Sequence, residues 1–346
     1  MTTQFKRFTL YWSSLTTYEN CPQSFLWGRG WGTIDLGGGP GRPKPLQLER
    51  SRHHAVMGIV LADFWEALYN NEEWRHPEGL LDRLLERARK CFDRELLNPR
   101  NFVDWRLAPP RSEMWDTIEE GIKGYLGTMK AHKLLGPYSR SEVDLTCYLD
   151  KWTPIGGRAD LIIRRDDTGI SILDGKNSRR YKNPKTGKFF TYTDPDQLRW
   201  YALCFYLSYR KYPDRLGFVY FRYPHGSPVL DSDGKPVPEV NEDGVPTGGT
   251  EMEPGVEWVT YTKDDLKGIA RRAKDALKGM QREKFPAVPV PSQCKFCDYE
   301  MVCPERQAQK QANRRNKKSS EAFFDGQVGL VTFGMGPKGS IILPDE

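Results

Sequence analysis

Four cysteines constrain the fold of this chain more than any other feature, because they lie near its two ends. Cys21 stands close to the start, and Cys294, Cys297 and Cys303 form a C-x2-C-x5-C run close to the end. Four thiolates are enough to hold one zinc ion or one iron–sulfur cluster. Because the ligands are so far apart in sequence, one shared metal centre would clasp the two ends of the chain around the residues between them.

The composition is that of a folded chain. Of the 346 residues, 38% are hydrophobic, which argues against extensive disorder. The net charge of +6 permits nucleic-acid binding without requiring it. No run approaches the roughly 18 apolar residues of a membrane helix, and the start lacks the apolar segment of a secretory signal. We therefore expect a cytoplasmic protein with no membrane partner, whose cysteines are metal ligands or core residues rather than disulfides.

Hydrophobic periodicity predicts a helical region followed by an α/β core. Helical spacing occurs over residues 54–69, 79–97 and 113–135, and then over 195–209. Strand-like patterns occur over 142–150, 156–164, 169–174 and 216–222. The order predicts an N-terminal helical region over 1–135, which carries the first cysteine, and a core over 136–285. That core is expected to be a mixed sheet flanked by helices.

The remaining segments interrupt or follow this core. Residues 224–255 are dense in Pro, Gly and Asp, so we expect an inserted loop or hairpin before a strand over 257–261. A basic helix over 263–283 leads to the cysteine-bearing segment 286–306. Residues 307–346 are expected to form a basic tail and a small appendage.

Two acids and a lysine make up the candidate catalytic group. Asp160 lies within one predicted strand, Asp174 ends the next, and Lys176 follows two residues later. In a hairpin the two carboxylates can reach one point, because adjacent strands lie about 4.8 Å apart. Carboxylates so placed repel each other unless a divalent cation such as Mg²⁺ or Mn²⁺ neutralises them. Side chains alternate faces along a strand, so Lys176 shares the face of Asp174 and can orient an attacking water.

The next helix strengthens this interpretation. Gln197 and Tyr201 stand four residues apart and therefore share one helix face. Taken alone, Asp174 and Lys176 would be better explained as a turn residue and an ordinary surface lysine. With Gln197 and Tyr201, the chain resembles the RecB-like branch of the PD-(D/E)XK nuclease superfamily, in which Gln-x3-Tyr follows the catalytic lysine.

Both ends of the chain extend the resemblance. The opening, with Tyr18, Cys21, Pro22 and Phe25, looks like the N-terminal signature of that branch. The C-x2-C-x5-C run looks like its iron–sulfur staple, as in AddB-type nucleases and CRISPR-associated adaptation nucleases. The resemblance thus implies a restriction-endonuclease-like core with an N-terminal helical subdomain and a C-terminal iron–sulfur staple.

The resemblance also assigns roles to individual residues. It implies metal ligands at Asp160 and Asp174, a catalytic lysine at Lys176, and supporting, DNA-contacting side chains at Gln197 and Tyr201. It implies a 4Fe–4S cluster on Cys21, Cys294, Cys297 and Cys303, with zinc as the alternative because thiolate spacing does not separate the two. The implied activity is metal-dependent exonuclease cleavage of single-stranded DNA or DNA ends.

One departure concerns a third metal ligand. Family members usually carry a His four residues after a Gly on the first core helix. Here Gly58 is followed at that spacing by Ala62, with Asp63 next, and His54 lies one turn earlier. We take His54 as the candidate third ligand and Asp63 as a further one. A missing ligand would shift metal preference toward Mn²⁺ or lower activity.

A basic and aromatic stretch separates the lysine from the Gln helix. Its residues are Arg179, Arg180, Tyr181, Lys182, Lys185, Lys188, Phe189, Phe190 and Tyr192. Cations that neutralise phosphates beside stacking rings predict a single-strand channel. The alternative is a solvated loop whose rings are buried.

Three other functions stay open. The chain could be an inactive nuclease retained as a cluster-bearing DNA-binding subunit. It could process DNA ends only with a partner, such as a helicase, recombinase or integrase. It could also be a zinc-stapled endonuclease.

Overall fold

The computed structural model describes residues 9–29 and 52–315, except residues 102, 152, 184, 242–244, 296 and 298. Contacts divide the chain into two compact units. Unit 1 comprises Met1–Thr16, Trp31–Thr33 and Gln47–Lys284, and unit 2 comprises Thr17–Gly30, Ile34–Leu46 and Phe285–Glu346. Among the described residues, no helix combines the length and apolar character needed to cross a membrane.

Unit 1 is built on a mixed sheet with the strand order β12-β9-β6-β5-β2. Its strands are β2 (Arg140–Asp144), β5 (Arg158–Arg165), β6 (Gly169–Lys176), β9 (Arg215–Tyr220) and β12 (Val256–Val259). Strand β6 pairs antiparallel with β5 and parallel with β9. The parallel connection runs through helix α6 (Pro195–Tyr209), so the predicted mixed sheet is confirmed.

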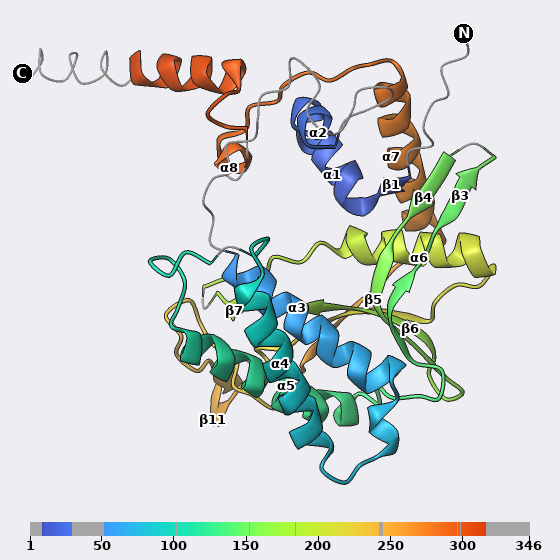
Figure 1. Cartoon of the computed structure of the whole chain (residues 1–346), viewed down its shortest axis with the longest axis vertical. Coiled ribbons are helices and arrows are strands. Elements are labelled where there is room, and N and C mark those ends of the chain that lie inside the picture. Colours follow the sequence, from blue (N-terminus) through green and yellow to red (C-terminus); the bar gives the residue numbers. More distant parts are fainter. Residues whose placement is uncertain are drawn as a thin grey trace, which may run out of the picture. The chain divides into compact units, whose positions relative to one another are not determined.

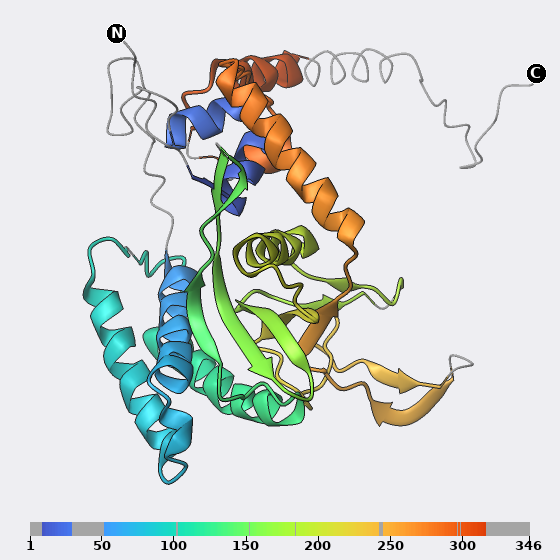
Figure 2. The same cartoon turned by 90° about the vertical axis from the view of Figure 1, so that its right-hand side faces the viewer.

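Helices cover both faces of this sheet. The chain forms α3 (His53–Trp65), a π-helical turn (Glu66–Asn70), a 3-10 turn (Glu73–Arg75), α4 (Leu80–Leu97) and α5 (Arg111–Ala131). Apolar side chains of α3, α4 and α5 pack against Leu161, Leu173 and Val219 in one buried core. Helix α6 contacts β6 and β9 from the other face, as Figure 2 shows. Asp194 caps α6 and Pro195 occupies its first turn, which explains why the helix begins there.

One predicted strand is wrong. The stretch 142–150 is two strands, β2 and β3 (Cys147–Asp150), and they belong to different sheets. Glu142 has a left-handed backbone (φ 54°), and the chain leaves β5 after Leu145, whose N–H and carbonyl bond to Gly157. Strand β3 pairs instead with β4 (Thr153–Gly156), which lies parallel to β1 (Leu10–Tyr11).

Two hairpins and one further helix complete unit 1. The first hairpin is β7 (Tyr181–Lys182) with β8 (Phe189–Phe190), and β7 is labelled in Figure 1. The second, β10 (Pro238–Val240) with β11 (Pro246–Thr250), lies in the predicted insertion. Helix α7 (Lys263–Gln281) begins at a capping box made by Thr262 and Asp265, and it packs on α6.

Unit 2 brings together the first and last described segments of the chain. Helix α1 (Trp12–Asn20) contains the unit boundary, and α2 (Pro22–Arg29) follows. The ring of Phe25 stacks on Phe285 with centroids 6.4 Å apart, and Trp27 meets Tyr299 edge-on at 5.3 Å. The late segment contains α8 (Pro291–Cys294) and a helix over 304–315. The small appendage predicted in the tail falls on residues 316–346, outside the described residues.

Candidate active site

Strand register places the two candidate acids, Asp160 and Asp174, side by side, and we call this pair the acid row. Leu161 pairs with Leu173, so the antiparallel ladder sets Asp160 opposite Asp174 one residue further on. Directly opposite residues have Cβ atoms about 4.5–5.5 Å apart. Asp160 Oδ2 accepts a hydrogen bond from the backbone N–H of Gly175 at 2.9 Å. The two predicted metal ligands therefore lie side by side, near the start of β5 and the end of β6.

Lys176 and Gln197 close a hydrogen-bonded ring with Asp174. The Lys176 ammonium lies 2.5 Å from Asp174 Oδ2 and donates to Gln197 Oε1 at 3.1 Å. Gln197 Nε2 donates to Asp174 Oδ1 at 2.9 Å and lies 3.0 Å from the Tyr201 hydroxyl oxygen. One glutamine thus fixes both the acid and the lysine, and four of the predicted catalytic side chains form a single network.

Burial makes it unfavourable for both acids of this cluster to be ionised at the same time. Burial and the neighbouring Asp174 raise the pKa of Asp160 to about 8, while burial raises the pKa of Asp174 and Lys176 opposes that rise. Asp174 is 2% exposed. Asp174 is buried and Asp160 is half-buried, and both resist ionisation, so together they fit the donor set of a hard divalent cation, which would favour their charged forms.

Glu142 is a third acid that the sequence analysis did not include. Ser141 pairs with Leu161 and Val143 with Ala159, so β2 carries Glu142 to the position opposite Asp160. Glu142 and Asp160 line one pocket of about 350 Å³, and burial raises the pKa of Glu142. The sequence placed Glu142 at the start of a predicted strand, but only the pairing of β2 with β5 shows that it lies beside Asp160.

Asn177 also lines this pocket. Neither polar atom of its buried side-chain amide has a hydrogen-bond partner among the described residues. A buried amide without a partner costs about 1–3 kcal/mol per lost hydrogen bond, so it marks a place where a ligand or water would bond. Sequence alone gave no signal for this residue beyond its position after Lys176.

The candidate third ligands lie elsewhere. Ala62, at the position where relatives carry His, lines the pocket with Gly58. His54 is exposed on the first turn of α3, where its ring lies 3.9 Å from that of His53, and it does not line the pocket. Both oxygens of Asp63 accept bonds from Arg87 of α4, at 2.8 and 3.0 Å. The structure therefore brings neither side chain to the acid pair.

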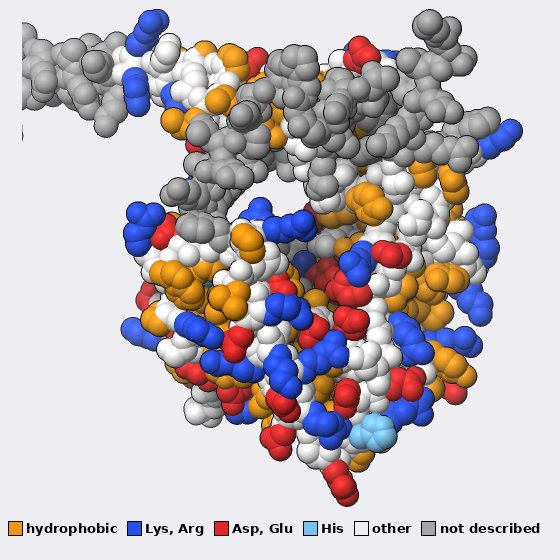
Figure 3. Space-filling view, viewed as in Figure 1, with side chains coloured by type: hydrophobic (Ala, Val, Ile, Leu, Met, Phe, Trp, Pro, Cys, Tyr) orange, Lys and Arg blue, Asp and Glu red, His pale blue; other side chains and the backbone are white. Residues whose placement is uncertain are grey.

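Two cations of the basic stretch after Lys176 form ion pairs inside the protein. Arg180 is buried and ion-paired with Glu253 and Glu257 at 3.1 and 3.0 Å, and Lys182 is paired with Glu251 at 2.5 Å. These two cations hold the insertion instead of facing solvent. Over the face of unit 1 seen in Figure 3, Lys and Arg side chains are intermingled with Asp and Glu.

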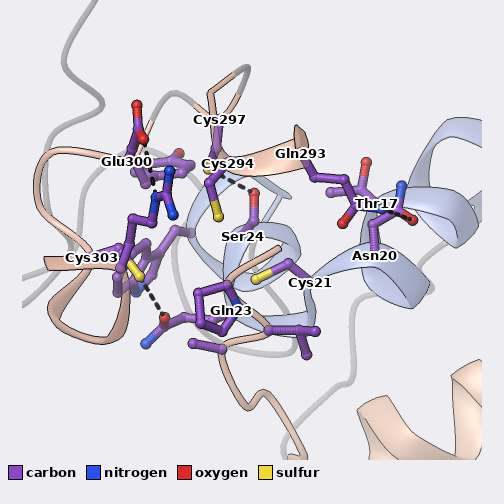
Figure 4. A pocket seen from close by; sticks show the side chains of 16 residues that line it. Thr17, Asn20, Cys21, Gln23, Ser24, Gln293, Cys294, Cys297, Glu300 and Cys303 are labelled. Carbon is purple, nitrogen blue, oxygen red and sulfur yellow. Dashed lines mark hydrogen bonds and ion pairs between the residues drawn. The ribbon is translucent and has the colours of Figure 1, made fainter. Parts of the chain in front are cut away.

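The four predicted cysteines line one pocket inside unit 2. Cys21 lies between α1 and α2, Cys294 ends α8, and Cys297 and Cys303 follow in the next turns, around a space of about 190 Å³ (Figure 4). All four are free thiols and half-buried. Their contacts are weak: Cys297 Sγ lies 3.6 Å from the Ser24 hydroxyl.

Two of the four thiols, those of Cys294 and Cys303, ionise less readily here than a free cysteine does. Burial is the main cause that raises the pKa of Cys294 and of Cys303, and the neighbouring Cys297 and Cys21 add to it for Cys294. A soft metal would favour the thiolate forms. Yet among the residues described in either unit, no three His, Cys, Asp or Glu side chains are grouped closely enough to hold a metal ion as they stand.

Comparison with known proteins places the chain in a family. The sequence has no significant match among curated proteins. The crystal structure of SSO0001 is 18% identical over 57% of this chain and 75% of its own, with a TM-score of 0.29, a similarity too weak to carry a conclusion. The family model described as PD-(D/E)XK nuclease superfamily matches residues 11–304, a span that includes the acid row, the lysine and all four clustered cysteines. The chain belongs to the PD-(D/E)XK nuclease superfamily, whose members are generally nucleases that use Mg²⁺ or Mn²⁺.

Proposed function

We propose that this chain is a metal-dependent DNA exonuclease that acts on single-stranded ends. The observation that carries the proposal is the ring formed by Asp174, Lys176 and Gln197, with Asp160 directly opposite. Superfamily membership supports phosphodiester hydrolysis as the reaction. The resemblance of the motifs to the RecB-like branch favours single-stranded DNA and ends as substrate.

Asp160 and Asp174 would hold the cation. When bound there, a Mg²⁺ or Mn²⁺ ion supplies Lewis-acid activation of water and neutralises charge on the phosphate. No three His, Cys, Asp or Glu side chains among the described residues are grouped closely enough to hold an ion, so water would complete the coordination of a cation on these two acids.

The protein's own groups position the reaction. In hydrolysis the water oxygen forms a bond to phosphorus and the bond from phosphorus to the leaving sugar oxygen breaks. One proton of the water is balanced by a proton taken up by the leaving oxygen, and the other passes to solvent. The Lys176 ammonium would orient the water and offset the charge that develops on the phosphate oxygens. Gln197 would keep Lys176 in place, because its amide oxygen accepts from the ammonium while its amide nitrogen donates to Asp174.

We further propose that Cys21, Cys294, Cys297 and Cys303 hold a 4Fe–4S cluster, with zinc as the alternative. The four thiols line one pocket, which supports a shared metal centre of either kind. Its role would be structural, because it would join α2 to the segment after α8 within unit 2.

A second candidate is a DNA-binding subunit that is inactive alone and works with a helicase, recombinase or integrase. One observation favours it: α3 presents the small side chain of Ala62 to the pocket where relatives have a His.

Digestion of linear and circular single-stranded DNA separates these functions. Protein purified without oxygen is incubated with each substrate and Mg²⁺ or Mn²⁺. The exonuclease proposal expects loss of the linear strand alone, and end-labelled strands then give the direction. Cutting of both strands would replace it with an endonuclease. Cutting of neither by folded, metal-loaded protein would favour the partner-dependent subunit.

A further inference from the structure

The hairpin β7–β8 has an outer face made of stacked aromatic rings. Tyr181 and Phe190 are cross-strand partners whose rings stack with centroids 4.9 Å apart and planes 20° from parallel. Tyr192 meets Phe190 edge-on at 5.0 Å, and the Arg179 guanidinium lies 5.1 Å from the Tyr181 ring. One cation and three rings therefore follow one another along a single surface.

This surface is open to solvent. Phe190 is 40% exposed and Tyr192 is 69% exposed. Exposed neighbouring rings are unusual on a surface that binds nothing, because they leave apolar area in water. Arg179, Lys185 and Lys188 are exposed in the same segment, and none of them forms an ion pair with any residue the structure describes; Arg179 donates one hydrogen bond, to the backbone carbonyl of Ser232 at 2.8 Å. The surface thus combines rings for stacking with cations that are available to phosphates.

The inner face of the hairpin explains why the rings are held in place. Side chains alternate along a strand, so Arg180, Lys182 and Phe189 point the other way. The Arg180 guanidinium lies 3.6 Å from the Phe189 ring and pairs with Glu253 and Glu257. The Lys182 N–H also donates to Leu230 of the insertion at 2.8 Å. The insertion 224–255 therefore holds the inner face of the hairpin in place.

Short segments of chain connect this surface to the candidate active site at both of its ends. Tyr181 lies five residues after Lys176, and Tyr192 lies five residues before Gln197. Both ends of the segment are thus fixed by the ring that joins Lys176, Asp174 and Gln197. A strand whose phosphate lies at the acid pair would have its neighbouring nucleotides within reach of the hairpin.

We propose that the outer face of β7–β8 is a stacking platform for single-stranded DNA, in which bases stack on Phe190 and Tyr192 while Arg179, Lys185 and Lys188 contact phosphates. Single-stranded DNA is the occupant because its bases are free to stack and its backbone complements the exposed cations. This inference rests on the proposed function and specifies where the substrate is held.

Fluorescence anisotropy of labelled dT20 in EDTA tests the platform without cleavage. The variant F190A/Y192A is expected to bind at least about tenfold more weakly than wild type, since each stacked base contributes about fivefold or more and two rings are removed. The matched control is Tyr209→Ala, which removes a ring of 54% exposure at the opposite end of α6, about 20 Å from Pro195. It should bind like wild type. Equal binding by F190A/Y192A and wild type would overturn the proposal.

Two further variants sharpen the result. Tyr192→Ala alone, which removes the most exposed of the rings, should lose several-fold affinity without a change in melting temperature, and unchanged affinity would count against the platform. R179Q/K185Q/K188Q should reduce the slope of log affinity against log salt by about 2, because each lost phosphate contact removes about 0.7. An unchanged slope would also overturn it. These titrations contain no metal and measure binding alone. If the digestion assay with Mg²⁺ or Mn²⁺ showed no cleavage, the proposed function would be wrong, but the result on DNA binding would still hold.

Discussion

The acid row of unit 1 and the pocket of unit 2 that is lined by the four clustered cysteines are held together by different kinds of contact. In the first, Asp174, Lys176 and Gln197 are hydrogen-bonded to one another and fixed by β6 and α6. In the second, thiols such as Cys297 and Cys303 line one space but have only long contacts to their neighbours, at 3.4–3.8 Å. Sheet register and helix packing therefore assemble the first site through direct contacts between its side chains, whereas in the second the thiols share a space with few direct contacts.

The largest expected effect is loss of cleavage on removing one acid. Asp174→Asn keeps the size of the side chain but removes a charge needed for the cation, so we expect at least about a 100-fold lower rate. Gel assays with end-labelled strands measure it. Asp166→Asn, in the turn between the same strands, is the control and should cleave normally. A fully active Asp174→Asn variant would mean that the row is structural only.

The next effect should be confined to unit 2. Cys297→Ser removes one thiolate, so the bound metal should be lost and amides of residues 17–29 and 285–315 should exchange hydrogen faster. Amides of the β5–β6 ladder should keep their protection. Cys147→Ser, a buried thiol of unit 1 outside the pocket, should leave iron or zinc content unchanged. Retention of metal and protection in Cys297→Ser would show that unit 2 is assembled without it.

Gln197 tests whether the preformed ring matters for catalysis. Gln197→Ala frees both Asp174 and Lys176, so kcat should fall by about 10–100-fold with little change in KM. Tyr201→Phe removes a single hydrogen bond of about 1 kcal/mol and should cost less than tenfold. If Gln197→Ala raised KM and left kcat unchanged, the glutamine would contact substrate instead of holding the site.

Glu142 tests the size of the acid row. Glu142→Gln should weaken Mn²⁺ binding by about tenfold, because one carboxylate next to Asp160 loses its charge. Isothermal titration measures this without cleavage. Equal affinity in wild type and variant would limit the row to Asp160 and Asp174.

The last effect concerns stability instead of activity, and it is a pH dependence measured in EDTA. The pKa of Asp160 rises from 3.8 to about 8 on folding, so the folded protein binds this proton more tightly than the unfolded chain does. The stabilisation is complete below about pH 4 and is lost as pH rises toward 8. The melting temperature should therefore fall from pH 5 to pH 8, and fall less in Asp160→Asn. Identical profiles would contradict the assigned pKa.

Local signals in the sequence predicted much of this molecule. The start of α6 was predictable because Asp194 and Pro195 cap it, and the hairpin with Asp160 and Asp174 followed from two alternating strands. The acids and lysine were predicted from the same pattern. Glu142 was missed because its role depends on pairing between β2 and β5, which the periodicity of 142–150 concealed.

The orientation of the basic stretch could not be predicted either. Arg180 and Lys182 were expected beside phosphates, but both turn inward because the insertion supplies Glu253 and Glu251 as partners. Those acids lie about 70 residues away in sequence, at separations of 73 and 69 residues. The hydrophobic pattern of a two-residue strand such as β7 does not show which of its two faces a segment this far away in sequence will cover.

Titration of Mn²⁺ into metal-free wild type, Asp160→Asn and Asp174→Asn at pH 8 tests most directly whether these two acids hold the cation. A preassembled acid row predicts one ion bound per chain in unit 1 of the wild type, with a rise in melting temperature on binding, and at least tenfold weaker binding in each variant. Equal binding by all three proteins would contradict the account, because the cation would then be held by other residues.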